Sequence, residues 1–330
     1  MKKRIEWIDM AKGYGILLVI YGHIDEFGTI GRWIYSFHVP IFFLLSGYVF
    51  NSDGGWKQFL KKKCRTILVP YFAYGIPILA VPVIRAFLWK RLRVAYLWKL
   101  AECFLLQKRL TTLWFLTCLF CLNVLFYVLT RLIKSDALLI CVSIAAAALG
   151  LWYYSMGGWA VPWNADVCLT ALPFFCAGYL CKKKSAMTAR FFEGRRIWAV
   201  MLGALFANVL LGQLNMKFSG VTLNMFHVEY GWALLAYPAA FAGVLFIVCL
   251  SKLRTVEGIA YIGRNSLIYF AWHQALILPV VDEVFLKLGL GGESPYGVVV
   301  LLAIVKTFLI VMILTAANML ITAAVRRIRG

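Results

Sequence analysis

Residues 9–23, DMAKGYGILLVIYGH, place Asp9, Lys12 and His23 in a segment that is otherwise apolar enough to cross a membrane. In an α-helix, Lys12 and His23 lie within about 20° of the same face and about 16 Å apart along the axis, and Asp9 falls on the same side. An ionisable side chain in a bilayer is costly unless it faces a protein interior or a water-filled cavity. We therefore predict a membrane helix over residues 8–24 with a functional polar stripe. The alternative is that Lys12 only reaches the cytoplasmic boundary and that His23 only ends the helix.

The composition is that of an integral membrane protein. Of the 330 residues, 63% are hydrophobic and the mean hydropathy is +0.82, whereas a soluble globular chain is about 45–50% apolar. The apolar runs are about 17–25 residues long, which fits membrane helices and not the alternating pattern of a β-barrel. The net charge of +20 comes from basic residues in short loops beside these runs, where the positive-inside rule places them. We therefore expect the lipid bilayer as a partner, and no nucleic acid.

The predicted fold class is an all-α polytopic membrane protein, a single domain over residues 1–330 with about ten transmembrane helices and both termini cytoplasmic. The cytoplasmic segments of this arrangement carry the larger share of lysine and arginine, which sets the orientation. The ten spans are residues 8–24, 32–50, 67–89, 112–132, 137–154, 166–181, 197–214, 230–251, 265–284 and 298–324.

Residues 90–109 are an exception to the charge pattern, because this segment is strongly basic although the orientation places it outside. It is either an interfacial amphipathic helix or a sign that a span has been miscounted there. The sequence contains no Asn-x-Ser/Thr acceptor for glycosylation, which is compatible with a bacterial source. We expect a multi-pass protein of the cell (inner or plasma) membrane.

Metal binding is not expected from the cysteines. Most of the nine lie in apolar runs, where cysteine behaves as a small hydrophobic residue. Cys118 and Cys121 form a C-x-x-C pair, but this pair has no second pair and no nearby histidine to complete a metal site.

Two further histidines lie in apolar runs. His38 is two residues before Pro40 in the second span. A proline removes a backbone donor from a helix, so a kink there can turn the histidine ring toward a cavity. A hydrogen-bonded histidine inside the bundle is an equal alternative. His273 lies in the ninth span, downstream of Asn265 and Ser266.

Basic side chains also occur at two places in or beside the spans. Lys62, Lys63 and Arg65 lead into the third span; positive-inside anchoring explains them, but a phosphate site would use the same residues. Lys306 lies inside the tenth span and needs a partner, for which Asp282 and Glu283, near the outer end of the ninth span, are candidates.

Several of these segments together carry a resemblance that covers nearly the whole chain. They are Trp7-Ile8-Asp9 to Lys12-Gly13 with His23 further along, His38-Val39-Pro40 to Ser46-Gly47-Tyr48, Lys62 to Pro70-Tyr71, Trp114-Phe115-Leu116, Pro173-Phe174 to Gly178, and Gly263-Arg264-Asn265-Ser266 to His273. In these residues the chain resembles the membrane-bound acyltransferase family 3, and within it the fucose 4-O-acetylase-like and enterobacterial-common-antigen O-acetyltransferase-like members. The opening and the Ser-Gly-Tyr element together are the most specific part.

The resemblance implies a membrane-bound O-acyltransferase. Such an enzyme transfers an acyl group, usually acetyl, from a cytoplasmic acyl-CoA such as acetyl-CoA to a hydroxyl of a carbohydrate or cell-envelope acceptor, as in polysaccharide modification. Acyl-CoA is then the donor co-substrate, and no metal is implied. Lys12 stands where most relatives have arginine, which weakens the expectation of a bidentate phosphate contact.

The predicted orientation assigns roles along the stripe. Lys12 is close to the cytoplasmic boundary and His23 is nearer the outer face, so we expect the CoA phosphates on Lys12 and Arg65, with Lys62 or Lys63 in support. Neutral His23 is the expected general base on the acceptor hydroxyl. Asp9 belongs to the catalytic group chiefly as the residue that holds Lys12.

His38 has three open roles: it orients His23, it donates to the thioester oxyanion, or it forms an acyl intermediate. The residues expected to line the substrate cavity are Ser46, Asn265, Ser266 and His273.

Two other functions fit the same polar stripe. One is a transporter or channel that conducts a small solute or protons, and the other is a receptor-like sensor without turnover. Binding of acyl-CoA separates the acyltransferase from both, and solute flux into proteoliposomes separates the transporter from the sensor.

Overall fold

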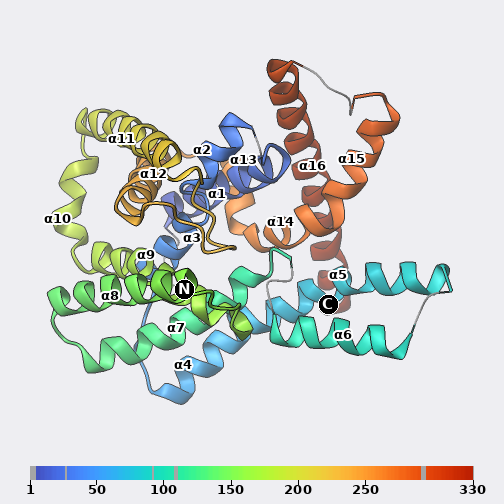
Figure 1. Cartoon of the computed structure of the whole chain (residues 1–330), viewed down its shortest axis with the longest axis horizontal. Coiled ribbons are helices and arrows are strands. Elements are labelled where there is room, and N and C mark those ends of the chain that lie inside the picture. Colours follow the sequence, from blue (N-terminus) through green and yellow to red (C-terminus); the bar gives the residue numbers. More distant parts are fainter. Residues whose placement is uncertain (1–4, 27, 91–92, 108–110, 291–294, 330) are drawn as a thin grey trace. The chain divides into compact units, whose positions relative to one another are not determined.

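The computed structural model of the chain describes residues 5–26, 28–90, 93–107, 111–290 and 295–329. Within these ranges the regular elements are helices, and the one β-type pairing is an isolated bridge between Asn224 and Glu229. The all-α prediction is therefore confirmed. The α-helices (Figure 1) are α1 (Glu6–Ile24), α2 (Thr29–Tyr35), α3 (Pro40–Tyr48), α4 (Trp56–Lys63), α5 (Val69–Leu88), α6 (Val94–Leu106), α7 (Trp114–Leu132), α8 (Asp136–Ser155), α9 (Ala165–Lys183), α10 (Ser185–Ala189), α11 (Arg196–Ser219), α12 (Ala233–Leu253), α13 (Glu257–Arg264), α14 (Ser266–Trp272), α15 (Leu278–Lys287) and α16 (Tyr296–Arg329).

Eight stretches of the described chain are long and apolar enough to cross a membrane. They coincide with eight of the ten predicted spans and are Trp56–Leu88, Trp114–Leu132, Asp136–Ser155, Pro162–Lys183, Arg196–Ser219, Ala233–Leu253, Ser266–Lys287 and Tyr296–Ile328. The predicted span 8–24 is helical in α1, but its ionisable residues lower its hydropathy. The count of ten and the orientation of the termini stay predictions.

The predicted span 32–50 is two short helices and not one. α2 ends at Tyr35 and α3 begins at Pro40, because a proline fits the first turn of a helix, where its missing N–H costs nothing, better than a helix interior. The hydrogen-bonded turns between them, with the His38 N–H donating to the Ile34 carbonyl at 3.1 Å, include His38 itself. The predicted kink before the proline is thus a complete helix break.

The basic segment 90–109 contains one described helix, α6. Its 13 residues reach about 20 Å, which is too short to cross a hydrocarbon core of about 30 Å, so the structure does not support a missed span there. α6 packs on α5, where the Tyr71 ring stacks on Phe104 with centroids 4.8 Å apart and the Tyr71 hydroxyl donates to the Phe104 carbonyl. Residues 91–92 and 108–110 of the segment lie outside the described ranges.

The helices form two compact units, each assembled from separate parts of the sequence. The first unit contains residues 1–39, 194–222 and 234–330, and the second contains residues 40–193 and 223–233. Each unit is described by itself below.

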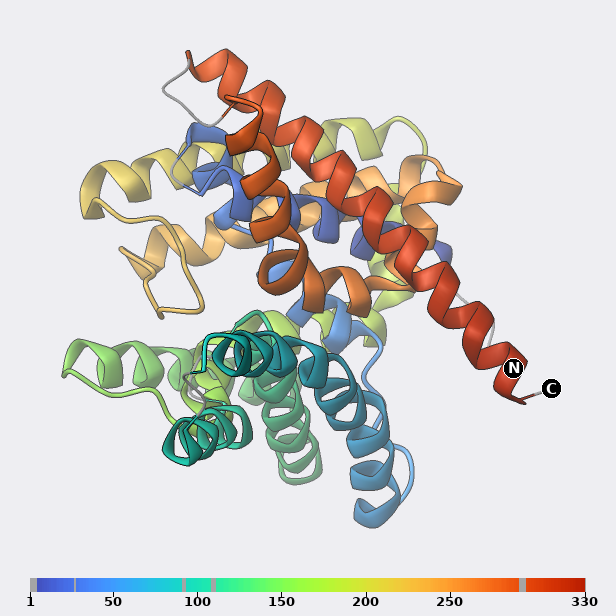
Figure 2. The ribbon, with the colours of Figure 1, turned by 90° about the vertical axis from the view of Figure 1, so that its right-hand side faces the viewer.

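In the first unit, α1 packs closely against α13. A Cβ on Gly13 would lie 2.1 Å from the Ile259 carbonyl oxygen, and a Cβ on Gly263 would lie 1.8 Å from the Asp9 carbonyl oxygen. Small residues at such a crossing let two helix backbones approach within van der Waals contact, which is a main source of helix association in membranes. The same unit contains α16, a 34-residue helix that runs beside α15 (Figure 2). There Lys306 Nζ lies 2.7 Å from Asp282 Oδ1. Asp282 is one of the two partners that the sequence predicted for Lys306.

In the second unit, α3 packs against α9 in the same way. A Cβ on Gly47 would lie 1.9 Å from the Phe175 carbonyl oxygen, and a Cβ on Gly178 would lie 1.9 Å from the Leu44 carbonyl oxygen. The aromatic rings of Phe50, Phe126 and Phe175 meet beside this crossing, with centroids 4.9–5.6 Å apart.

Two helical stretches widen into single π-helical turns, at Cys64–Leu68 and at His273–Ile277. Each is followed by a proline, Pro70 or Pro279, in the first turn of the next α-helix. A proline ring clashes with the carbonyl one turn earlier, and a wider turn relieves that clash without ending the helix. The two π turns contain Arg65 and His273, two of the residues singled out in the sequence.

Candidate active site

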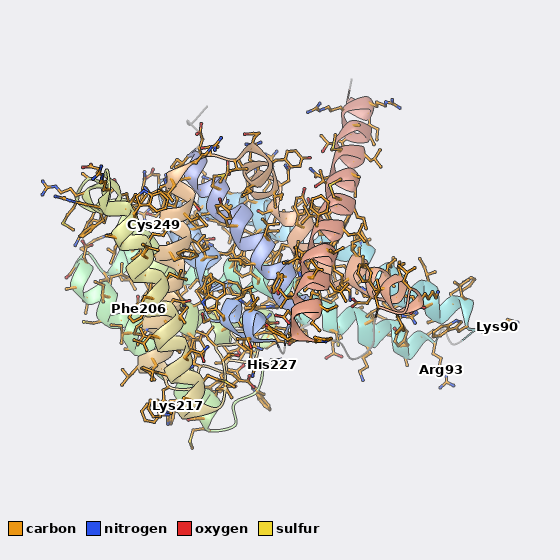
Figure 3. All side chains as sticks on the ribbon, turned by 90° about the horizontal axis from the view of Figure 1, so that it is seen from above. Lys90, Arg93, Phe206, Lys217, His227 and Cys249 are labelled. Atoms are coloured by element: carbon orange, nitrogen blue, oxygen red, sulfur yellow. The ribbon has the colours of Figure 1, made fainter. Side chains whose placement is uncertain are left out.

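Three of the four histidines belong to the first unit and lie close together. The rings of His23 and His273 have centroids 5.1 Å apart, and the Tyr35 ring lies 6.1 Å from His23 and 4.6 Å from His38. Gln274 adds a polar side chain to the group. We call His23, Tyr35, His38, His273 and Gln274 the histidine cluster. The fourth histidine, His227, which Figure 3 labels, is exposed and belongs to the second unit.

His23 is in the last turn of α1, and its Nδ1 is the nitrogen that neighbouring side chains engage. The Tyr35 hydroxyl lies 3.3 Å from Nδ1 and the Gln274 side-chain nitrogen lies 3.4 Å from it. Both neighbours are uncharged, and the His23 side chain is half-buried. The hydrogen bonds that His23 makes to these two side chains are therefore both made through Nδ1.

A tight turn between α1 and α2 brings Tyr35 back to His23. The buried carboxylate of Asp25 accepts the Gly31 N–H at 3.0 Å, which ties the start of α2 to the end of α1. A Cβ on Gly31 would lie 1.7 Å from the Asp25 carbonyl oxygen, so a glycine is needed for this approach. The seven-residue helix α2 then ends at Tyr35.

His273 is fully buried at the first position of its π-helical turn. Its Nδ1 lies 2.8 Å from the Tyr269 carbonyl oxygen and 3.0 Å from the Phe270 carbonyl oxygen. A carbonyl only accepts, so Nδ1 carries the proton and Nε2 carries the lone pair. Among the described residues this Nε2 has no hydrogen-bond partner. A buried acceptor of this kind is costly, and such groups occur where a ligand or water completes the site.

His38 is held in the same tautomer as His273. It is buried, and its Nδ1 lies 3.1 Å from the Ile34 carbonyl oxygen, so Nδ1–H donates there. The turn that carries His38 is fixed by Asn208 of α11. The Asn208 amide donates to Ser36 Oγ at 3.0 Å and to the Ala239 carbonyl at 2.8 Å, and it accepts from Trp33 Nε1 at 2.7 Å.

The other end of α1 holds a separate group of charges. Asp9 is buried and Lys12 is half-buried, and about 21 Å of helix separates Asp9 from His23. Arg264, the last residue of α13, donates to the Glu257 carboxylate. Glu257 first, and then Asp9, raise the pKa of the Arg264 guanidinium. Asp9 therefore belongs with the basic residues at this end and does not touch the histidine cluster.

Asn265 and Ser266 lie at the junction of α13 and α14. The Asn265 amide donates to the Tyr261 carbonyl at 2.9 Å, which fills one of its hydrogen-bonding positions. Both residues are half-buried and stand in the same helical stretch as His273, about two turns before it.

The remaining candidates belong to the second unit. Ser46 is half-buried in α3, and Lys62 and Arg65 are exposed at the α4–α5 junction. Lys63 instead stacks over the rings of Phe50 and Phe59, at 5.6 and 5.5 Å from their centroids. The chain between the second and third predicted spans is helical from Trp56 onward.

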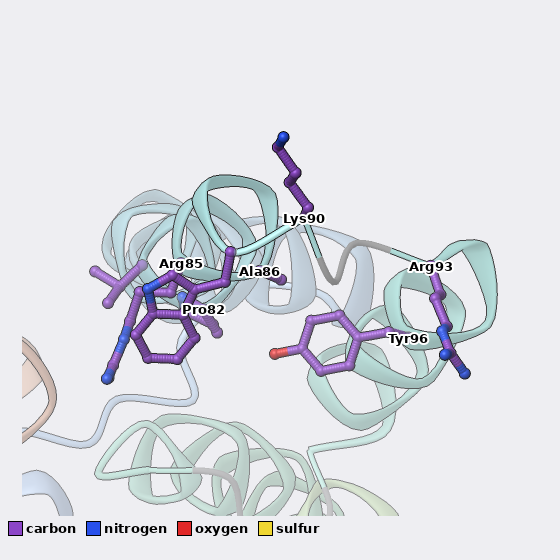
Figure 4. Close-up of a pocket in the computed structure, with 8 residues that line it drawn as sticks. Pro82, Arg85, Ala86, Lys90, Arg93 and Tyr96 are labelled. Carbon is purple, nitrogen blue, oxygen red and sulfur yellow. The ribbon is translucent and has the colours of Figure 1, made fainter.

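A cavity of about 880 Å³ lies in the second unit between the end of α5 and the start of α6. It is lined by Val81, Pro82, Arg85, Ala86, Trp89, Lys90, Arg93 and Tyr96. The Arg85 guanidinium stacks on Trp89 at 5.0 Å from the ring centroid. Lys90 and Arg93 extend away from the hollow (Figure 4), so the three cations do not converge on one point. None of the residues that line this cavity is a histidine, so the cavity does not bring two imidazole rings together as the histidine cluster does.

The comparison with protein families decides the class of the protein. A family model described as an acyltransferase domain matches residues 5–325, which is nearly the whole chain. The chain belongs to membrane acyltransferase family 3. It is therefore an acyl-transferring membrane enzyme, and the eight long apolar helical stretches of its described residues are those of a multi-pass membrane protein. No curated protein and no solved structure gives a significant match to this acyltransferase.

Tyr35 and Gln274 of the histidine cluster were not among the residues that the sequence predicts for the site of the acyltransferase. Gln274 directly follows His273, and Tyr35 lies three residues before His38, so both lie within one helical turn of a candidate in the sequence. Their contacts with His23 arise from the turn after α1 and from the π-helical turn at His273–Ile277. A polar residue next to a membrane histidine was the available signal.

Proposed function

We propose that the acyltransferase transfers an acetyl group from a cytoplasmic acyl-CoA to a hydroxyl of a carbohydrate or cell-envelope acceptor, with His23 as general base. The observation that carries the proposal is the environment of His23, where two uncharged side chains lie beside Nδ1 and the His273 ring lies 5.1 Å away. A neutral imidazole has the proton affinity suited to a general base near neutral pH.

In the proposed reaction, one proton moves from the acceptor hydroxyl to His23 and then to the CoA thiolate. The unprotonated ring nitrogen of His23 takes the proton of the acceptor hydroxyl while the oxygen attacks the thioester carbonyl carbon. The new C–O bond forms, the C–S bond breaks, and the CoA thiolate takes the proton back from the imidazolium. The products are the acetyl ester and CoA, and His23 is neutral again.

The tautomers of the other two histidines limit what they contribute to this reaction. His38 and His273 each donate Nδ1–H to a backbone carbonyl, so in the neutral form neither has a second N–H for an oxyanion. Each presents a lone pair on Nε2. We propose that they accept hydrogen bonds from substrate hydroxyls and that His38 also packs Tyr35 in place through its ring contact.

For the donor, we propose that Arg65, with Lys62, binds CoA phosphate on the second unit. Both side chains are exposed and basic at a π-helical turn, and arginine matches phosphate geometry. Lys12 is the corresponding candidate on the first unit. Lys63 is a weaker candidate, because its ammonium already covers two aromatic rings.

The experiment that tests the proposed function compares His23→Gln with wild type in membrane vesicles supplied with ¹⁴C-acetyl-CoA and an envelope fraction. Glutamine keeps a hydrogen-bonding side chain of similar reach but does not accept a proton. We expect transfer to fall by about 10²–10⁴-fold while acetyl-CoA binding persists. His227→Gln, which changes the exposed histidine, is the matched control. Full transfer by His23→Gln would exclude His23 as the base.

A further inference from the structure

The end of α5 and the start of α6 form a hairpin in the second unit that has no part in the proposed reaction. Its surface is apolar and uncovered: Ile84, Phe87, Trp89 and Trp98 are 54–73% exposed. In a membrane protein, an exposed apolar surface of this kind faces lipid. α5 ends a stretch long enough to cross a membrane, whereas α6 is too short to cross one. The turn between them, which is rich in tryptophan and basic residues, has the composition of a membrane interface.

The same hairpin is strongly basic. Residues 85–106 contain five basic residues and one acidic residue, Glu102. Arg85, Lys90 and Arg93 are exposed, and within the described ranges none of these three side chains forms an ion pair with a carboxylate. Solvation by water is enough to explain exposed cations, but it does not explain why they surround a hollow.

The cavity of about 880 Å³ between α5 and α6 is apolar inside and basic at its rim. Its size is within the range of about 300–1,000 Å³ that is typical of small-molecule sites. Lys90 and Arg93 extend away from the hollow, and the Tyr96 hydroxyl points from α6 toward α5 (Figure 4). The apolar lining comes from one face of α5 and from two aromatic rings: Val81, Pro82, Ala86, Trp89 and Tyr96.

This distribution of charge limits the kind of ligand. A free phosphate group is bound best by cations that converge on it, and these cations diverge. A purely apolar ligand would gain nothing from the basic rim. The ligand that matches both parts is an amphiphile with an apolar chain and an anionic head group.

We propose that the cavity binds an anionic phospholipid such as phosphatidylglycerol, with an acyl chain in the hollow and the phosphate at the rim. Arg85 is the side chain that reaches both parts. Its guanidinium stacks on the Trp89 ring, 5.0 Å from the centroid, so its face is covered and the N–H groups at its edge remain for a phosphate oxygen. Lys90 and Arg93 add attraction to the negative membrane surface around the bound lipid.

Acetyl-CoA is the other amphiphilic anion in the proposed reaction, but it fits this cavity less well. Its charge is concentrated in several phosphate groups, and its acyl part has only two carbons. The hollow offers the reverse, a large apolar lining with cations that point apart. Arg65 and Lys62, which we propose for the CoA phosphates, are also separate from the residues that line this cavity.

The test uses native mass spectrometry of the purified full-length protein in detergent, with equal amounts of phosphatidylglycerol and phosphatidylcholine. We expect the wild type to retain phosphatidylglycerol in preference. The double variant Arg85→Gln/Arg93→Gln removes two charges from exposed positions. It should lower the apparent affinity for phosphatidylglycerol by about 10-fold or more, the equivalent of two basic residues at an anionic surface, and leave phosphatidylcholine unchanged.

A second variant tests the hollow without touching the charges. Ala86→Leu adds apolar volume to the lining and should lower the retention of both lipids. Full retention by Ala86→Leu would show that no acyl chain enters the hollow, and the proposal would be wrong. The matched control for the charges is Arg326→Gln/Arg327→Gln, which removes two exposed arginines from the end of α16 and should leave the lipid preference unchanged. Equal losses in the two double variants would show a general effect of charge and overturn the site, as would a wild type without preference.

Competition separates the lipid from the acyl donor. Excess CoA or inorganic phosphate should not displace the phosphatidylglycerol that Arg85→Gln/Arg93→Gln fails to retain. Displacement by CoA would assign the cavity to the donor, and displacement by phosphate alone would show a simple anion site; either result would overturn the lipid assignment. The readout is bound lipid and not acyl transfer, so failure of the proposed function would leave this result unchanged.

Discussion

His23 and His273 lie with ring centroids 5.1 Å apart and planes tilted by 30°, although they come from opposite ends of the sequence. Their hydrogen bonds differ. His273 gives its Nδ1 proton to two backbone carbonyls, whereas His23 meets only side chains. Backbone carbonyls thus fix which ring nitrogen of His273 carries the proton, whereas for His23 the neighbouring side chains decide it.

The first prediction separates the two nitrogens of His273. In His273→Asn, the amide nitrogen takes the place of Nδ1 and keeps the donation to the carbonyls, but Nε2 is lost. We expect normal amounts of folded protein and a kcat lowered by about 10- to 100-fold, because an acceptor for a substrate hydroxyl is gone. His273→Gln, which approximates Nε2 and loses the donor, should instead lower stability. Wild-type kcat in His273→Asn would show that Nε2 has no part in turnover.

The second prediction concerns the support of the His38 turn. Asn208→Leu keeps the volume of the side chain but leaves Trp33 Nε1, Ser36 Oγ and the Ala239 carbonyl without this partner. Each buried group that loses its partner costs about 1–3 kcal/mol, so we expect a clear fall in the thermal unfolding temperature in detergent. Val209→Leu, on the exposed face of the same helix, is the control. An unchanged unfolding temperature would mean that other groups, or water, replace Asn208.

The third prediction concerns the crossing of α1 and α13. Gly13→Ala places a methyl group 2.1 Å from the Ile259 carbonyl oxygen, and the helices must separate to admit it. Overpacking of this kind costs about 1–3 kcal/mol, and the displacement of α1 should also lower activity by moving His23. Gly203→Ala, in α11 where no heavy atom lies within 4 Å of the added methyl, should leave the unfolding temperature unchanged or slightly raised. Equal unfolding temperatures for the two variants would contradict the close packing.

The sequence predicted that the chain is helical and where the long helices lie. It could do so because apolar runs of about 20 residues have few other stable forms in a bilayer. The polar stripe of α1 rests on helix periodicity alone, which relates Lys12 to His23, and it stays a prediction. The same local logic identified Asp282 as one of two partners for Lys306.

The details that complete the candidate site depend on tertiary contacts. To predict the break between α2 and α3, one would have to know that the chain turns back after Asp25. Pro40 by itself is also compatible with a kink in one continuous helix. The contact between Gln274 and His23 joins residues from distant parts of the chain and leaves no periodic signal in either segment. Hydropathy also could not show that α6 is a short helix packed on α5, because its apolar residues resemble those of a span.

The last prediction concerns the basic π-helical turn of the second unit. Arg65 is exposed there, and a phosphate contact far from the reacting carbon contributes equally to ground-state and transition-state binding. Arg65→Ala should therefore raise KM for acetyl-CoA by about 10-fold or more, the equivalent of one charge-assisted hydrogen bond, and change kcat little. Lys57→Ala removes a positive charge from the exposed surface of α4 and should change neither constant, which excludes a general effect of charge. High salt should narrow the difference between wild type and Arg65→Ala, because screening weakens an exposed ion contact. A collapse of kcat with KM unchanged would instead place Arg65 in the chemistry or in the packing of α5, and the phosphate assignment would be wrong.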